Sequence, residues 1–222
     1  MKPNANDDTL KSVNESYETA AAVEALTNWY AVPKERAFVQ HLFDGLEVPS
    51  SGMLVEIGGG AGIQGLLVRD LFQDRYLHSD YSAALVMQAK KRGLNSMVVD
   101  GLSMPFADAS VAALLLTGPT TIIHEQAMRD RQFEECARVL ASRGVLIMIT
   151  SRLAFLKRYH CLDREDLAKL ASLGFDPVRF ASWGMLPGKW WRPWNQKLFS
   201  SIESLAGRLG LGVRRILVAR KR

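Results

Sequence analysis

The sequence predicts an α/β protein with a doubly wound, mostly parallel β-sheet and helices on both of its faces. Short apolar runs alternate with segments of helical spacing along most of the 222 residues. A glycine-dense turn joins the first clear apolar run to a helix. Composition agrees with this class, because 48% hydrophobic and 23% charged residues are ordinary globular values. The longest strictly apolar run, Val111–Leu116, is far shorter than the ~20 residues of a membrane span.

The N-terminal part predicts an arm and a first helix that precede the main domain. Apolar residues between Val23 and Tyr30 predict the helix, within an N-terminal unit of residues 1–32. Pro33 can begin a second helix, and we expect one domain over residues 33–222. The beginning of the chain is polar and lacks an apolar stretch of the signal-peptide type, so we expect a cytoplasmic protein.

Alternating elements follow in order along the domain. Buried-strand patterns are each bounded by turn residues, and helical spacing lies between most of them. Asp163 is expected to cap a late helix that Gly174 ends. Strands are predicted over residues 53–57, 75–78, 97–99, 111–116, 145–150, 178–180 and 213–219, and helices over residues 63–72, 82–91, 126–140 and 163–174.

Cysteine content and charge limit the possible chemistry. Cys136 and Cys161 are the only cysteines and lack metal-like spacing, so we expect neither a disulfide framework nor a metal site. Residues 181–222 hold nine Lys and Arg against one acid, a balance of +8, and the rest of the chain sums to −3. Such an end can bind nucleic acid, anionic lipid or a phosphorylated substrate, or it can be a solvated surface.

The glycine-rich turn at residues 55–62 is the sharpest signal in the sequence. Glycines allow positive φ and let a ligand approach bare backbone, beside the free amides of a helix start. One frame, residues 60–65, matches a dinucleotide fingerprint, with Asp80 as the ribose-binding acid. The competing frame begins at Glu56, whose carboxylate would face a pyrophosphate badly but suits a ligand with an amino-acid end. A turn without a ligand is the third interpretation.

Further segments favour the second frame. In their order and spacing they resemble the class I S-adenosylmethionine-dependent methyltransferases, in the large group that includes the quinone-biosynthesis methyltransferases. The resemblance implies a Rossmann-like sheet of seven strands with the last strand antiparallel. The segments that match, besides the glycine turn, are residues 79–82, 99–108, 135–140, 174–175 and 216–220.

The resemblance also implies the roles of individual residues in binding S-adenosylmethionine. The glycines would approach the methionine part, with Glu56 anchoring that region through its charge. Asp80 would accept hydrogen bonds from the ribose hydroxyls, and Asp100 from the adenine amino group. The expected cofactor-binding residues are Glu56, Gly58, Gly60, Gly62, Asp80, Tyr81, Asp100, Gly101, Leu102 and Thr117.

The sequence departs from the family pattern where the acceptor is expected. Residues 117–120 lack the Asn or Asp followed by Pro-Pro that is common in enzymes methylating exocyclic amines, which disfavours nucleic acid as acceptor. Ala112 and residues 142–144 also differ from the family, at positions expected to shape the sheet. His124 is the best-placed candidate for a catalytic base, with a structural role as its alternative. His41, His78 and His160 are expected to be surface or capping residues.

These observations favour methyl transfer to oxygen or carbon of a small, apolar or lipid-linked molecule. The alternatives are a methyltransferase acting on RNA or protein, a non-catalytic partner subunit and, more remotely, an NAD-dependent dehydrogenase. Tyr17 and Trp29 could cover the cofactor from the N-terminal unit.

A tryptophan-rich insertion at about residues 183–211 is the most distinctive segment. Four of the five tryptophans lie between Trp183 and Trp194. A helical stripe of apolar residues follows, from Leu198 to Leu209. The segment could be core, a lid over an apolar acceptor, or a peripheral membrane contact with Trp and Lys/Arg at the interface.

Overall fold

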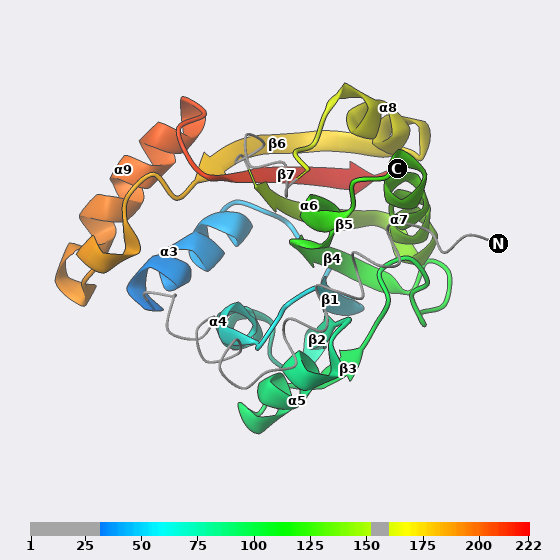
Figure 1. Cartoon of the computed structure of the whole chain (residues 1–222), viewed down its shortest axis with the longest axis horizontal. Helices are drawn as coiled ribbons and strands as arrows, with labels where there is room; N and C mark the ends of the chain where they lie inside the picture. Colours follow the sequence, from blue (N-terminus) through cyan, green and yellow to red (C-terminus); the bar gives the residue numbers. More distant parts are fainter. Residues whose placement is uncertain (1–31, 152–159) are drawn as a thin grey trace.

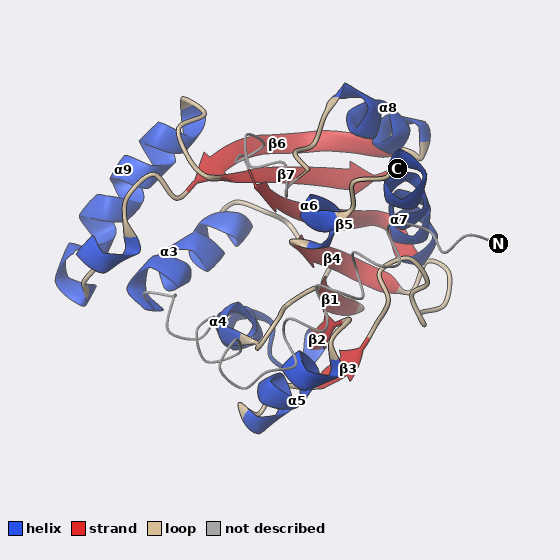
Figure 2. Ribbon diagram, in the orientation of Figure 1, coloured by secondary structure: helices blue, strands red, loops and turns tan. Residues whose placement is uncertain are grey.

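The computed structural model describes residues 32–151 and 160–222, which form one sheet with helices on both faces (Figures 1 and 2). The predicted first helix, Tyr17 and Trp29 lie outside the described residues. No helix in these two ranges is long and apolar enough to cross a membrane.

The sheet has seven strands in the order β3-β2-β1-β4-β5-β7-β6. Neighbours from β3 to β5 pair in parallel, whereas β7 is antiparallel to both β5 and β6. This arrangement confirms the predicted fold class, including the antiparallel last strand. The strands are β1 Met53–Ile57, β2 Tyr76–Asp80, β3 Ser96–Val98, β4 Val111–Thr117, β5 Leu140–Ser151, β6 Phe175–Trp183 and β7 Arg214–Lys221.

Helices cover the two faces because successive strand residues point to opposite sides. Leu54 of β1 joins a core with α3 and α4, and its neighbour Val55 joins a second core with α7 and α8. The helices are α3 Val32–Phe43, α4 Ile63–Phe72, α5 Ala83–Lys91, α6 Pro119–Ile122, α7 Gln126–Val139, α8 Arg164–Ser172 and α9 Gln196–Arg208, with 3-10 turns η1 Gln73–Arg75, η2 Gly188–Trp190 and η3 Pro193–Asn195.

Two strands begin clearly earlier than their patterns predict: β6 starts at Phe175 instead of residue 178, and β5 shows the larger difference. β5 starts at Leu140, whereas the sequence predicted residues 145–150. Its first part contains Arg143 at a φ of 62°, and the pairing with β4 shifts register between Val111 and Ala113. Because the start of β5 is irregular, the spacing of apolar residues alone does not predict this part of the strand.

The segment between β6 and β7 lies at the same edge of the sheet as the glycine turn. Trp183 pairs with Arg214, which also pairs with Ser151 at the end of β5. Because β5 runs parallel to β4 and β1, the end of β6 lies at the carboxyl edge of those strands. Residues 184–213, including α9, leave and rejoin the sheet there, next to α3 (Figure 1).

Candidate functional site

The glycine turn leaves β1 at Ile57 and opens α4. Gly58, Gly60 and Gly62 have φ values of 79°, 60° and 80°, in the region that favours glycine. A Cβ on Gly60 would meet nothing within 4 Å, whereas one on Gly62 would lie 2.5 Å from Cδ1 of Leu94. Gly60 is therefore open toward a ligand, and Gly62 is needed for close packing against the segment after α5.

Asp80 joins the end of β2 to this turn. Its Oδ2 accepts a hydrogen bond of 2.9 Å from the amide of Gly60, and its Oδ1 accepts one of 2.8 Å from the amide of Ser82. Burial raises the pKa of Asp80, although these two hydrogen bonds act in the opposite direction. The carboxylate thus lies against the open glycine.

Glu56 lies beneath the turn and is fully buried. Its Oε1 accepts a hydrogen bond of 2.9 Å from Thr117 Oγ1, and its Oε2 accepts one from the hydroxyl of Tyr76. Burial, followed by the neighbouring Glu56 carboxylate, raises the pKa of Tyr76 well above its ordinary value. Through these contacts Glu56 joins β1, β2 and β4 under the turn.

His78 belongs to the same buried layer. Its side chain is fully buried and its Nδ1 lies 2.7 Å from Oγ of Ser96. The expectation of a surface or capping histidine is wrong, because β2 is an interior strand of the sheet. A Cβ on Gly59 would lie 2.5 Å from His78 Nε2 and 2.8 Å from Cδ of Glu56, so the turn rests directly on this layer.

The remaining predicted cofactor residues follow the neighbouring strands at the same edge. Asp100 is exposed after β3, and its Oδ1 accepts a hydrogen bond of 2.8 Å from the amide of Leu102. Gly101 between them is partly buried, and Tyr81 after β2 is 47% exposed. Since β3, β2, β1 and β4 are adjacent, the fold brings the predicted set to one edge.

His124 follows α6, beyond the end of β4. Its side chain is exposed, and its carbonyl oxygen accepts a hydrogen bond of 2.7 Å from Arg129. The position is on the acceptor side of the predicted site, so the role of base stays a prediction.

An ion pair that the sequence did not reveal joins α3 to this edge. The carboxylate of Glu35 accepts hydrogen bonds of 2.9 and 3.0 Å from Arg214 at the start of β7. Glu35 also accepts a hydrogen bond from Gln64, in the first turn of α4. The partners Glu35 and Arg214 are 179 residues apart, so no local pattern could have found them.

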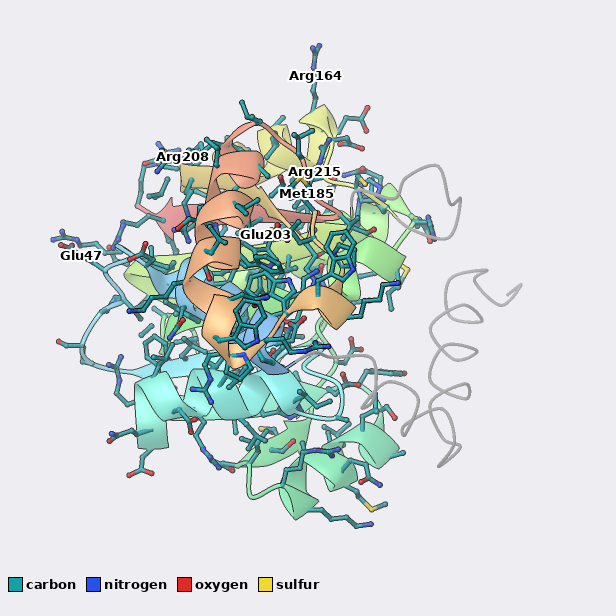
Figure 3. All side chains as sticks on the ribbon, turned by 90° about the vertical axis from the view of Figure 1, so that its left-hand side faces the viewer. Glu47, Arg164, Met185, Glu203, Arg208 and Arg215 are labelled. Carbon is teal, nitrogen blue, oxygen red and sulfur yellow. The ribbon has the colours of Figure 1, made fainter. Side chains whose placement is uncertain are left out.

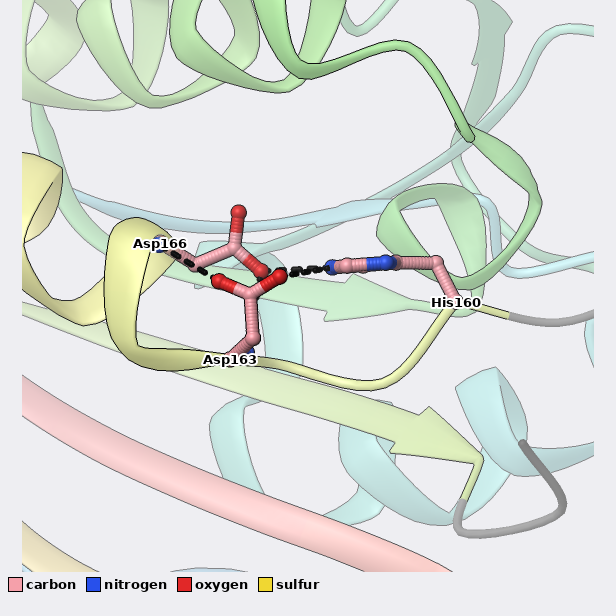
Figure 4. A group of neighbouring side chains, drawn as sticks. All are labelled: His160, Asp163 and Asp166. Carbon is pink, nitrogen blue, oxygen red and sulfur yellow. Dashed lines mark hydrogen bonds and ion pairs between the residues drawn. The ribbon is translucent and has the colours of Figure 1, made fainter.

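A second ionic group surrounds the start of α8 (Figure 4). The ligand-type atoms of His160, Asp163 and Asp166 lie within 4.8 Å of one another, as a metal site requires. However, Arg129 Nε lies 2.9 Å from the buried Asp166 and already supplies a positive charge. His160 Nε2 lies 2.5 Å from the other carboxylate oxygen of Asp166. Asp163 and Asp166 form a capping box at the start of the helix. The group therefore serves as a helix cap and ion pair, as expected for Asp163 and His160.

Two cavities lie away from the predicted cofactor residues. One of about 550 Å³ is lined by residues of α4, η1 and the segment before β3, including Arg69 and Asn95. The other, of about 320 Å³, lies between α3, β6 and α9, with His41 and Arg208 in its wall. Neither contains Gly60, Asp80 or Asp100.

The tryptophan-rich insertion is partly core. Trp183 and Trp191 are buried and face Phe38 and Phe199, whereas Trp190 and Trp194 are 53% and 84% exposed. The core interpretation holds for one pair of tryptophans, and the other pair remains on the surface.

Comparison with known proteins points to one enzyme class. A family model described as a methyltransferase domain matches residues 55–148. A mouse protein named "Probable tRNA methyltransferase 9B" is 32% identical over 148 residues, which cover 67% of this chain and 31% of that protein. The chain thus spans about a third of the length of the curated relatives it matches.

Solved structures agree on the fold. The geranyl diphosphate C-methyltransferase of Streptomyces coelicolor aligns with a TM-score of 0.62 at 19% identity, over 85% of this chain and 81% of that one. A chain of the Haloferax volcanii complex that contains the Trm112 methyltransferase activator aligns with a TM-score of 0.67 at 13% identity, over 93% and 96% of the two chains.

Proposed function

We propose that this chain, a member of the class I S-adenosylmethionine-dependent methyltransferases, binds its cofactor across the carboxyl ends of β3, β2, β1 and β4. The observation that carries the proposal is the open Gly60 turn with the Asp80 carboxylate held against it. This juxtaposition offers backbone atoms and one acid to a nucleoside with an amino-acid end. Asp80 would bind the ribose hydroxyls, and the exposed Asp100 would receive the adenine amino group.

Glu56 supports this site from beneath. Because its side chain is fully buried and accepts hydrogen bonds from Tyr76 and Thr117, it acts on the shape of the turn. Its negative charge contributes to the potential at the turn over a short distance through protein. The cofactor itself supplies the sulfonium methyl group, and the protein supplies in-line positioning.

The acceptor that we propose is a small, apolar or lipid-linked molecule, methylated at oxygen or carbon. Support comes from the tryptophan-rich insertion, which lies at the same edge as the cofactor site and is rich in apolar surface. His124 would take the acceptor proton where the chemistry releases one. We expect the enzyme to act in the cytoplasm.

RNA is the second candidate acceptor. It is favoured by the relatives named as tRNA methyltransferases and by the basic C-terminal segment. Residues 117–120 argue against RNA as the acceptor, because they lack the Asn or Asp followed by Pro-Pro that is common in enzymes methylating exocyclic amines.

The test incubates the full chain and S-adenosylmethionine carrying a labelled methyl group with a cellular lipid extract, a small-molecule extract or total tRNA, in separate reactions. We expect label in the organic phase, and its loss in Asp80→Asn. Asp70→Asn, an exposed acid on α4, is the matched control and should keep activity. Label in tRNA alone would replace the lipid-linked acceptor by RNA, and no label in lipid, tRNA or a small-molecule extract would refute methyl transfer.

A further inference from the structure

The outer side of α9 carries an unusual apolar stripe. Leu198, Leu205 and Leu209 are 61%, 63% and 69% exposed. Spacings of seven and four residues place them along one line that runs from α9 to its C-cap residue, Leu209. Trp194, just before the helix, is 84% exposed. The sequence left open whether this stripe forms core, a lid or a membrane contact, and the structure shows these three leucines facing outward.

The buried side of α9 explains this orientation. Glu203 is fully buried, and its carboxylate accepts hydrogen bonds of 2.9, 3.0 and 2.7 Å from the amides of Gly184, Met185 and Leu186. A Cβ on Gly207 would lie 2.4 Å from the carbonyl oxygen of Ser182, so only glycine lets the helix approach β6 this closely. These contacts fix the rotation of α9 and leave its leucines outside.

Positive charge borders the stripe. Figure 3 looks onto α9, with Arg208, Met185 and Arg215 around its upper half. Glu203 is the only acid between residues 184 and 215, and it is buried. The exposed surface of this segment therefore combines apolar and basic side chains without an acid. Its exposed basic residues are Lys189, Arg192, Lys197, Arg208 and Arg215.

We propose that this surface, named here the α9 face, lies on an anionic lipid membrane with its leucines and exposed tryptophans among the acyl chains. A helix with an apolar stripe, flanking Lys and Arg, and tryptophan at its end has the features of a helix that lies in the plane of a membrane interface. Lys197 and Arg208 each precede a stripe leucine by one position, so they can reach lipid phosphates while the leucines insert.

Charge complementarity selects an anionic partner, and the leucines distinguish lipid from nucleic acid. Single-stranded nucleic acid binds through basic grooves and aromatic stacking, and gains little from a line of exposed leucines. A membrane uses both parts of the α9 face, since acyl chains accept leucine and phosphates accept Lys and Arg. Because the face lies at the same edge as the proposed cofactor site, a lipid-linked acceptor could reach that site from the bilayer surface.

The experiment is co-sedimentation of the full chain with vesicles of phosphatidylcholine containing 30% phosphatidylglycerol, and with vesicles of phosphatidylcholine alone. Burying one leucine is worth about one factor of ten or more in an equilibrium constant. The double variant Leu205→Glu, Leu209→Glu, called the α9 variant below, should therefore bind the anionic vesicles at least ~10-fold more weakly. Met87→Glu, at a 57% exposed position on α5, is the matched control and should change binding less than ~2-fold.

Unchanged melting temperatures would show that both variants fold, which is expected because every altered side chain is exposed. Failure of the wild-type chain to bind anionic vesicles would overturn the proposal, as would equal losses in the α9 variant and Met87→Glu. Binding of a labelled single-stranded RNA that the α9 variant loses, without vesicle binding, would reassign the face to nucleic acid. A dimer of the wild-type chain that becomes a monomer in the variant, again without vesicle binding, would reassign it to a second copy. Vesicle binding requires no methyl transfer, so failure here leaves the proposed function standing.

Discussion

The glycine-turn region and the α9 region each contain a fully buried, hydrogen-bonded carboxylate, but the apolar side chains are buried in the first region and partly exposed in the second. The two buried acids are Glu56 and Glu203. Glu56 accepts from side chains of β2 and β4 beneath the turn, whereas Glu203 accepts from backbone amides of the loop at residues 184–186. Around Glu56, the apolar side chains of β1 lie in the two cores. Around Glu203, Leu198 and Leu205 of the same helix and Leu209 at its C-cap face outward.

This difference separates what the fold requires from what a partner requires. Buried carboxylates are costly unless they are hydrogen-bonded, and both acids are hydrogen-bonded, so each has a structural role. An exposed apolar line gives no such internal benefit, and large exposed apolar patches mark interaction sites. We expect the first region to govern cofactor binding, and the second to govern binding of the protein to a membrane.

The largest expected effect is that of Glu203→Ala. This change leaves three backbone amides, those of residues 184–186, without their carboxylate acceptor. At 1–3 kcal/mol for each buried polar group left unpaired, we expect a loss of about 4 kcal/mol in the free energy of unfolding. Chemical denaturation measures it, and Glu134→Ala, an exposed glutamate of α7, is the control. A loss below ~1 kcal/mol would contradict the role assigned to Glu203.

Two glycine-to-alanine changes compare the regions directly. In Gly59→Ala the new Cβ meets the buried ring of His78, and in Gly207→Ala it meets backbone of β6. Overpacking of this kind costs about 1–3 kcal/mol, so both variants should lose stability. Only Gly59→Ala should also weaken S-adenosylmethionine binding, measured by calorimetry below the melting temperature. Equal effects of the two changes on that affinity would remove the proposed division between the regions.

Asp80→Asn tests the first region without a change in volume. Hydrogen bonds to a charged group are worth about 1.5–3 kcal/mol, so cofactor affinity should fall ~10–100-fold. Calorimetric titration with S-adenosylhomocysteine gives the dissociation constant, beside Asp70→Asn as the control. Unchanged binding would withdraw Asp80 from the site.

The smallest effect concerns pH and lies outside both regions. Burial acts to raise the pKa of Asp166, but the hydrogen bonds from His160 and Arg129 outweigh it and leave the pKa below its usual value. The ionised form therefore stabilises the fold above the unfolded pKa of about 3.9, and this contribution is lost as the pH falls through the lower folded value. Asp166→Asn should cost about 1–2 kcal/mol at pH 7 and less at pH 3. The same loss at both pH values, measured by denaturation, would contradict this ionic role.

The sequence predicted the framework well where local signals coincide. β1 and α4 have the predicted bounds, because a buried apolar run is followed at once by glycines that adopt positive φ and form the turn into the helix. The predicted cofactor residues lie at or just after the carboxyl ends of strands that prove adjacent, which agrees with the site that the resemblance implied. Their binding roles stay predictions.

Other features depend on partners that are distant in the chain. His78 is buried because β2 is interior and Ser96 lies beside it, which β2 alone could not reveal. The sequence left the orientation of α9 open for a related reason. Apolar spacing identified the leucine line, but the helix packs through Glu203 and Gly207, whose contacts with residues 182–186 appear only in three dimensions.

The central claim is that the glycine turn binds a sulfonium nucleoside and its product. Its most direct test is calorimetric titration of the unmodified full chain with S-adenosylmethionine, S-adenosylhomocysteine and NAD in parallel. We expect saturable one-to-one binding of the first two and none of NAD. Binding of NAD alone, or no binding of either sulfur-containing nucleoside, would contradict the account.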